Sequence, residues 1–198
     1  MPTEQSSMAA TTAHSTCPWW LGYLLASPVR RIFQPPTKLL APHIRPGMTV
    51  LEPGPGMGFF TLDLMRLTGP GGRVLAVDIE PRMLASLRRR AAEAGLLDRL
   101  ETRLATADSL GLGSFDGAID FTLAFAMVHE LPAPEPFFHQ AARASKPGAR
   151  LLLVEPKGHV TAALFERELR AARDAGFTPV PTFATNHPLT ALLEKTGA

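Results

Sequence analysis

The part of the sequence best suited to ligand chemistry is a turn with glycines at alternate positions, Gly54, Gly56 and Gly58. Glycine has no Cβ atom and tolerates positive φ, so a ligand can approach the main chain of such a turn closely. Glu52 stands two residues before the first glycine and adds a carboxylate. A backbone cradle beside an acid suits a small ligand that carries a positive charge.

The turn differs from a dinucleotide-binding turn, which has the pattern G-x-G-x-x-G and rests a pyrophosphate on the following helix. Phe59 stands where the third glycine of that pattern would be, and the Glu52 carboxylate would repel a pyrophosphate. A nicotinamide-dependent oxidoreductase is therefore the less favoured alternative.

A second acid, Asp78, follows the next apolar segment of the chain. At the end of a second strand, a carboxylate accepts hydrogen bonds from ribose hydroxyls. A ribose site beside a loop suited to an amino-acid ammonium group indicates a nucleoside joined to an amino acid without phosphate. These residues predict that the cofactor is S-adenosylmethionine.

The rest of the chain predicts a scaffold that brings these residues together. Short apolar runs that end before turn residues predict strands, and amphipathic runs between them predict helices. We expect strands over residues 48–52, 73–77, 100–105, 119–125, 150–155, 177–183 and 189–194, and helices over 59–67, 81–94, 134–144 and 161–175. This alternation predicts an α/β protein with a doubly wound, mostly parallel sheet, whose ligand crevice lies beyond the carboxyl ends of the strands.

We divide the 198 residues into a flexible tail (1–13), an N-terminal helical lid or cap segment (14–46) and a cofactor-binding domain (47–198). Both tryptophans and the only tyrosine lie in the second segment. As a lid, this segment would present Trp20 or Tyr23 to the substrate. The alternatives are that it covers a bare sheet face or mediates a dimer.

Composition narrows the possible partners and the location. The formal net charge is +2 without a long Lys/Arg block, which makes nucleic acid an unfavoured partner. Cys17 is the only cysteine, so no intrachain disulfide or Cys-rich metal site can form, and no metal is expected from His129, Glu130 and His139. The apolar run 18–26 is too short to span a bilayer, and we expect a cytoplasmic protein.

Residues 49–156 resemble the class I S-adenosylmethionine-dependent methyltransferases, particularly the small-molecule branch related to the quinone-biosynthesis enzymes. Residues 50–58 resemble the first motif of that family, and residues 74–81 resemble its ribose motif. Further similarity lies at 107–109, 119–120 and 146–148. The resemblance implies a Rossmann-like methyltransferase fold with seven strands in the order 3-2-1-4-5-7-6, the last of them antiparallel.

The resemblance also implies roles for individual residues. The residues implied in cofactor binding are Glu52, Gly54, Gly56, Gly58, Asp78, Ile79, Asp108, Ser109 and Phe125. His129 and Glu130 lie just beyond the fourth strand and are the catalytic candidates, because an imidazole or a carboxylate can act as a general base. The alternative for His129 is that it packs in the loop or caps the next helix. His159 is a further candidate, or else a solvated loop histidine.

The expected function is methyl transfer to a small-molecule acceptor by in-line displacement, in which positioning supplies up to ~7–11 kcal/mol. A general base is needed only if the acceptor must lose a proton. The alternatives are a non-enzymatic S-adenosylmethionine-binding module, an RNA methyltransferase and the oxidoreductase considered above. We expect Asp63 and the run Arg88 to Arg90 to face solvent on their helices.

Overall fold

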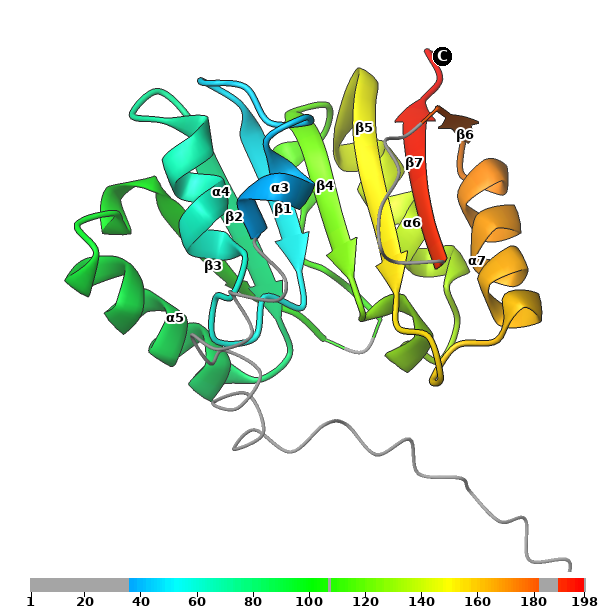
Figure 1. Cartoon of the computed structure of the whole chain (residues 1–198), viewed down its shortest axis with the longest axis horizontal. Helices are drawn as coiled ribbons and strands as arrows, with labels where there is room; N and C mark the ends of the chain where they lie inside the picture. Colours follow the sequence, from blue (N-terminus) through cyan, green and yellow to red (C-terminus); the bar gives the residue numbers. More distant parts are fainter. Residues whose placement is uncertain (1–35, 107, 182–188, 198) are drawn as a thin grey trace, which may run out of the picture.

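A seven-stranded sheet forms the centre of the computed structural model, which describes residues 36–106, 108–181 and 189–197 (Figure 1). The strands are β1 (Thr49–Pro53), β2 (Arg73–Asp78), β3 (Leu100–Leu104), β4 (Ile119–Phe125), β5 (Ser145–Glu155), β6 (Phe177–Val180) and β7 (Leu189–Lys195). Their order is β3-β2-β1-β4-β5-β7-β6. Only β7 pairs antiparallel with its neighbours β5 and β6, so the predicted fold class, strand order and antiparallel strand are confirmed.

Helices cover both faces of the sheet (Figure 1). On one face lie α3 (Pro36–Leu40), α4 (Thr61–Thr68) and α5 (Pro81–Glu93), whose apolar side chains share a core with Val50 and Phe121. On the other face lie α6 (Glu135–Ala144) and α7 (Ala162–Asp174), which share a core with Leu151 and Leu153. Three short 3₁₀ helices, η1 (Leu97–Arg99), η2 (Gly113–Phe115) and η3 (Val128–Glu130), complete the described elements.

Local sequence signals begin the longer helices. The Glu80 side chain accepts a hydrogen bond from the Arg82 N–H at 3.0 Å, and Pro81 occupies the first turn of α5. At the start of α7, the Thr161 hydroxyl accepts from the Leu164 N–H at 3.2 Å. A capping side chain supplies an acceptor for an N–H group that has no partner within the helix.

Two elements begin two or more residues away from their predicted starts. Strand β5 begins at Ser145 rather than at residue 150, because Ser145 pairs with Ile119 before the register shifts between Ile119 and Phe121. Helix α4 begins at Thr61, since the residues just after Gly58 still belong to the turn. The predicted strand over 177–183 corresponds to β6, and part of that range lies outside the described residues.

The expectation that Asp63 faces solvent is wrong. Asp63 is only 4% exposed in the first turn of α4, where its carboxylate lies 3.5 Å from the Arg66 guanidinium. An acid in the first turn is favoured by the helix dipole.

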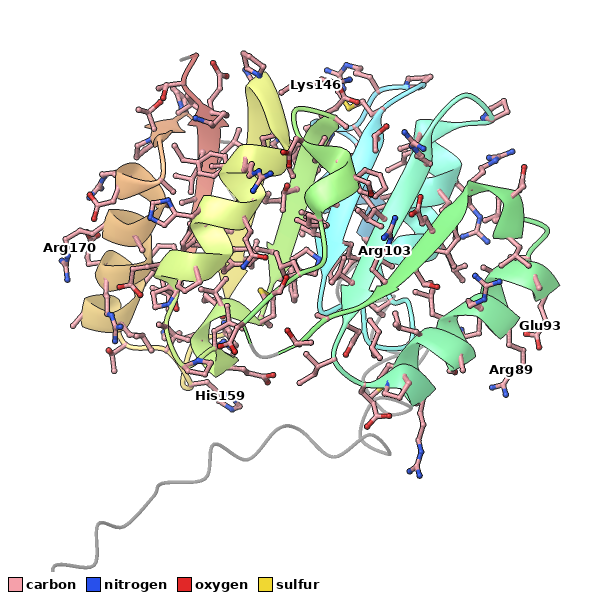
Figure 2. The ribbon with its side chains drawn as sticks, turned by 180° about the vertical axis from the view of Figure 1, so that it is seen from behind. Arg89, Glu93, Arg103, Lys146, His159 and Arg170 are labelled. Carbon is pink, nitrogen blue, oxygen red and sulfur yellow. The ribbon has the colours of Figure 1, made fainter. Side chains whose placement is uncertain are left out.

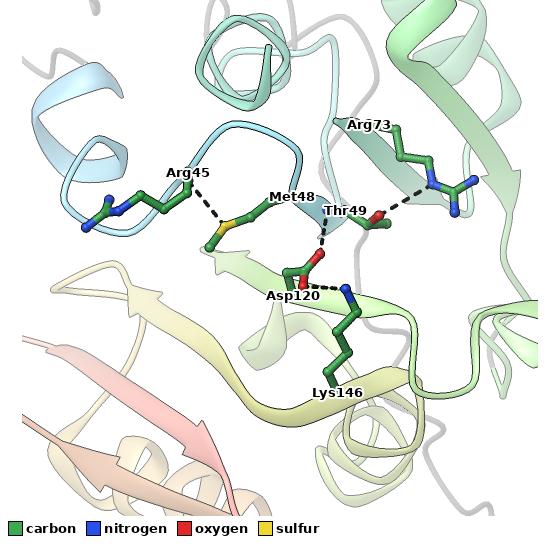
Figure 3. A network of polar contacts seen from close by, with 6 residues as sticks. All are labelled: Arg45, Met48, Thr49, Arg73, Asp120 and Lys146. Carbon is green, nitrogen blue, oxygen red and sulfur yellow. Dashed lines mark hydrogen bonds and ion pairs between the residues drawn. The ribbon is translucent and has the colours of Figure 1, made fainter. Parts of the chain in front are cut away.

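The amino-terminal ends of the central strands are joined by a polar network (Figure 3). Asp120 accepts the Thr49 N–H at 2.8 Å through Oδ2 and lies 2.5 Å from the Lys146 ammonium through Oδ1. The Arg73 guanidinium donates to the Thr49 hydroxyl at 3.5 Å. One carboxylate therefore connects β1, β4 and β5 at the end of the sheet where these strands begin.

The predictions for the tail and for most of the lid segment, including Trp20 and Tyr23, lie outside the described residues. Helix α3 is the part of residues 14–46 that the structure describes as helical. Across the described ranges, every helix is too short or too polar to cross a bilayer.

Candidate active site

A cleft of about 750 Å³ opens at the carboxyl ends of the parallel strands. This volume is within the ~300–1,000 Å³ typical of small-molecule sites. The predicted residues that line it are Glu52, Gly54, Gly56, Asp78, Ile79, Asp108, Ser109, Phe125, His129 and Glu130. The structure thus brings both catalytic candidates and all the cofactor-binding candidates except Gly58 into one cavity.

The glycine turn has the backbone geometry that its composition predicts. Gly54 has a φ of +65° and donates its N–H to the Val77 carbonyl at 2.8 Å, which ties the turn to β2. A Cβ atom at this position would lie 3.1 Å from the Met127 Cβ. The first glycine is therefore where the turn after β1 comes against the loop after β4.

Gly58 lies behind the turn and does not line the cleft. Its φ is +85°, and a Cβ atom there would overlap the Leu87 side chain on α5. Arg90, on the same helix, donates a hydrogen bond from Nη1 to the Met57 carbonyl and is half-buried. The expectation that Arg90 faces solvent is wrong, because this arginine holds the glycine turn against α5.

Glu52 is buried at the end of β1, with 3% of its surface exposed. Within the described part of the chain, its Oε2 atom has no hydrogen-bond partner. Burial raises the pKa of Glu52 to about 7; the nearby Asp78 charge adds to this effect and the Thr61 hydroxyl opposes it. A cation at this point would stabilise the charged carboxylate, so the site fits the ammonium group of an amino acid.

Asp78 ends β2 and is oriented by the backbone that follows it. The Glu80 N–H donates to Asp78 Oδ1 at 3.0 Å. Burial raises the pKa of Asp78, while the N–H groups of Glu80, Gly56 and Ile79 act in the opposite direction. The next side chain, Ile79, is 55% exposed in the wall of the cleft, where it can cover the face of an apolar ring.

The turn after β3 is held by a residue that the sequence analysis did not identify, Gln140 on α6. Its side-chain oxygen accepts the Leu110 N–H at 2.8 Å, and its amide nitrogen donates to the Asp108 carbonyl at 3.2 Å. Ser109 is fixed within the turn, since its hydroxyl accepts the Gly111 N–H at 3.1 Å. Gln140 also lines the cleft, so one side chain both fixes this turn and faces a ligand.

Three aromatic side chains that pack against one another line the cleft: Phe59, Phe60 and Phe125. Phe60 packs edge-on against Phe59, with ring centroids 4.8 Å apart, and its ring is tilted by 48° against that of Phe125, with centroids 4.5 Å apart. Phe59 is 6% exposed. The position that would be the third glycine of a dinucleotide site is therefore a core aromatic residue.

His129 is held by Glu155, a buried acid at the end of β5. His129 Nδ1 lies 2.5 Å from Glu155 Oε2, and Glu155 Oε1 accepts the N–H groups of Val128 at 2.9 Å and His129 at 3.3 Å. The hydrogen bond to Glu155 raises the pKa of His129; burial opposes this, and the charges of Glu155, Glu130 and Glu168 add to it. The sequence analysis missed this role of Glu155, although, like Glu52 and Asp78, it is an acid near the carboxyl end of a strand.

The other candidates near His129 are more exposed. Glu130 and His159 line the mouth of the cleft, and the His159 ring lies edge-on to His129, with centroids 6.2 Å apart. Figure 2 shows His159 at the end of the sheet opposite Lys146. No group of three metal-ligating side chains occurs among the residues whose positions are described, and His139 does not line the cleft.

The parallel sheet, the glycine turn after its first strand and the acid at the end of its second define a Rossmann-like α/β protein with a ligand site at the strand ends. Residues 51–153 match the family model described as a methyltransferase domain. The chain belongs to this family, and the predicted class I methyltransferase resemblance is confirmed.

A curated relative from Brucella canis is named as a ubiquinone/menaquinone biosynthesis C-methyltransferase. It is 36% identical over 118 residues, which cover 59% of this chain and 42% of the relative. The chain therefore aligns with less than half the length of that enzyme.

Solved structures share the fold. A SAM-dependent methyltransferase from Aquifex aeolicus superimposes with a TM-score of 0.77 at 23% identity, over 90% of this chain and 98% of that one. Geranyl diphosphate C-methyltransferase from Streptomyces coelicolor, solved with Mg²⁺, geranyl diphosphate and S-adenosyl-L-homocysteine, gives 0.67 at 15% identity, covering 84% and 80% of the two chains.

Proposed function

We propose that this chain transfers the methyl group of S-adenosylmethionine to a small, largely apolar acceptor bound in the same cleft. The observation that carries the proposal is that one cavity joins a glycine turn and two acids at one side to a histidine at the other. Membership of the methyltransferase family supports it. The relative from Brucella canis is named for the same type of reaction.

We assign the cofactor to the β1 and β2 side of the cleft. Glu52, with its unpaired buried oxygen, would receive the ammonium group, and Asp78 would receive the ribose hydroxyls. Ile79, Asp108 and Ser109 would surround the adenine. S-adenosylmethionine supplies an electrophilic methyl group, so the main task of the protein is to hold donor and acceptor in line.

The acceptor would occupy the side of the cleft beyond Phe125. This wall is mostly apolar and contains Met127, Leu131, Pro136 and Phe137. Apolar walls with a few polar groups are typical of small-molecule sites. The weak net charge of the chain also favours a small acceptor over nucleic acid, and we keep a cytoplasmic location as part of the proposal.

The prediction that residues 14–46 form a lid can be tested by fluorescence. Both tryptophans of the chain lie in that segment, so intrinsic tryptophan emission reports on it alone. If the lid closes, S-adenosylhomocysteine will change the emission of the full chain, and Trp20→Phe will reduce that change. Saturable binding without any change in emission would contradict the lid.

Binding of labelled S-adenosylmethionine to the full chain tests the cofactor assignment. We expect saturable binding that is lost when Gly56→Val and Asp78→Ala are combined. Glu93→Ala serves as the control, because Glu93 is an exposed residue on α5 whose ion pair with Arg89 spans 3.8 Å (Figure 2). Unsaturable binding, or binding by the double variant as tight as that of the wild type, would overturn the assignment. Transfer of the label to an acceptor would distinguish an enzyme from a binding module.

A further inference from the structure

Behind His129 lie two buried carboxyl groups that methyl positioning alone does not require. Glu155 ends β5 with a side chain that is 0% exposed, and Glu168 lies on α7 with 1% of its surface exposed. Both carboxylate oxygens of Glu168 are buried without a hydrogen-bond partner among the residues described. Buried acids without such partners are costly in a protein core, so this arrangement calls for a specific explanation.

The contacts of Glu155 define the protonation of the histidine. Each of its oxygens already accepts a hydrogen bond, Oε1 from the Val128 and His129 backbone and Oε2 from the His129 ring at 2.5 Å. A carboxylate in this role only accepts, so the proton of a neutral imidazole stays on Nδ1. The other ring nitrogen, Nε2, then keeps a lone pair, and His129 lines the cleft.

We propose that His129 is a general base, that Glu155 is its positioning residue, and that the acceptor is therefore a molecule that must lose a proton when it is methylated. Phenols, enols and activated carbon acids form this class. Tertiary amines and thioethers do not, because their lone pairs attack without losing a proton. This inference rests on the proposed methyl transfer and adds the class of acceptor.

The proton balance of the step is complete within the site. The acceptor X–H forms its new X–CH₃ bond while the S–CH₃ bond breaks, and sulfur keeps the electron pair of that bond. His129 Nε2 takes the proton from X–H. The resulting imidazolium is paired with the Glu155 carboxylate across the 2.5 Å contact.

The charges that face the histidine come from separate parts of the fold. Glu155 lies on β5, Glu168 on α7, Glu130 on η3 beside His129, and the His159 ring packs edge-on from the loop after β5. Burial and the Glu155 charge raise the pKa of Glu168 to about 7, with His129 acting in the opposite direction. Glu168 thus influences the imidazole through its charge and not through a hydrogen bond.

A purely structural ion pair predicts different behaviour from a base. It would hold the imidazole charged and leave neither ring nitrogen for an acceptor. The distinction is the state of His129 at the working pH, which ¹⁵N NMR of the histidine ring measures directly.

The deciding experiment is ¹⁵N NMR titration of the full chain with S-adenosylhomocysteine bound. We expect the Nδ1–H tautomer for His129, a pKa above its ordinary value, and a fall of about one pH unit in Glu155→Gln. Glu168→Gln should cause a smaller fall, whereas Glu166→Gln, an exposed acid on the same helix, should cause none. An Nε2–H tautomer, an imidazole that stays charged through pH 8, or equal titration in all variants would overturn the inference.

Binding of S-adenosylhomocysteine in the same samples separates this inference from the proposed function. If Glu155→Gln binds S-adenosylhomocysteine with unchanged affinity but His129 loses its tautomer preference, the positioning role of Glu155 is supported. Failure to bind in the wild-type chain would instead count against the proposed function. If Glu155→Gln does not fold, the wild-type tautomer and Glu168→Gln still decide the outcome.

The class of acceptor is tested by transfer of the label from S-adenosylmethionine. We expect transfer to 1,4-dihydroxynaphthalene but not to a thioether probe, and the reverse result would overturn the inferred class of acceptor.

Discussion

The two sides of the cleft use acidic residues at strand ends in opposite ways. On the β1 side, Glu52 is buried with an oxygen that has no protein partner among the described residues. On the β5 side, both oxygens of Glu155 are engaged by the loop that carries His129. Similar residues at the same edge of the sheet thus differ in their partners: Glu155 is paired with a protein side chain, whereas the counter-charge of Glu52 would, in the proposed function, come from a bound ligand.

The backbone differs in the same way. The turn after β1 reaches positive φ with glycines, whereas the turn after β4 reaches it with Ala126, whose φ is +53°. Glycine adopts this conformation freely, but a residue with a Cβ atom is strained there. The comparison suggests that the β1 side is built for ligand access to the main chain and the β4 side for side-chain placement.

Among the tests of this comparison, replacement of His129 should have the largest effect. His129→Asn keeps a donor for Glu155 but removes the base, so methyl transfer to 1,4-dihydroxynaphthalene should slow by about 10²–10⁴-fold. The affinity for S-adenosylhomocysteine should stay unchanged. Rapid-quench measurement of labelled transfer gives the rate, with His139→Asn, an exposed residue outside the cleft, as control. A full rate in His129→Asn would remove the functional difference between the two sides.

The pH dependence of stability tests the unpaired acid. Because the pKa of Glu52 is raised to about 7 when folded, this residue favours the folded state at low pH, and that contribution is lost as pH rises from about 4.5 to 7. Above pH 7 and without ligand, the free energy of unfolding of Glu52→Gln should therefore be about 3 kcal/mol larger than that of the wild type.

The same substitution should weaken S-adenosylhomocysteine binding, because the ammonium group loses its counter-charge. Urea unfolding at pH 5 and pH 8 and calorimetric binding at pH 8 measure the two effects. A variant that is no more stable at pH 8, or that binds as tightly as wild type, would show that Glu52 is not reserved for a cation.

The contact between the two sides can be tested at Gly54. Gly54→Ala should destabilise the fold by about 1–2 kcal/mol, since the residue has positive φ and its Cβ would press on Met127. Gly117→Ala is the matched control, with a φ of +60° and no atom within 4 Å of the added Cβ. Thermal unfolding measures both variants, and equal losses would mean that the Met127 contact has no cost.

The smallest expected effect concerns the strained residue after β4. Ala126→Gly should raise stability by about 0.5 kcal/mol, because relief of the positive φ slightly exceeds the entropy that glycine loses on folding. Ala124→Gly, a buried position in β4, should lower stability instead. A loss at both positions would show that Ala126 is not strained.

The sequence predicted the β1 side of the cleft better than the β4 and β5 side for a physical reason. A glycine turn and the following acid act through local backbone geometry, which residue types and spacing record directly. Arg90 and Gln140 act from helices that neighbour the site only after folding, and their sequence context resembles a solvated helix face. Glu168 interrupts the apolar stripe of α7 between Phe165 and Leu169, a signal that could have been noticed.

The alternation of strands and helices predicted a doubly wound, mostly parallel sheet, but the strand order was predictable only through the family resemblance, whose motifs occur in order along the chain. The start of β5 was not predictable, because the register shift between Ile119 and Phe121 depends on pairing between segments that are distant in the sequence. Residues 20 and 23 remain predictions, as they lie outside the described part of the chain.

The polar network around Asp120 restricts the separation of the central strands of the sheet. The β1 and β4 ladder joins the two halves of the sheet through two residue pairs, whereas β1 and β2 share five. Asp120 reinforces this seam at the end remote from the cleft by accepting the Thr49 amide and binding Lys146. We therefore expect β1, β4 and β5 to stay together when a ligand enters, so that access to the cleft depends on the loops at the opposite end of the sheet. The hydrogen bond to Asp120 should slow exchange of the Thr49 amide with solvent.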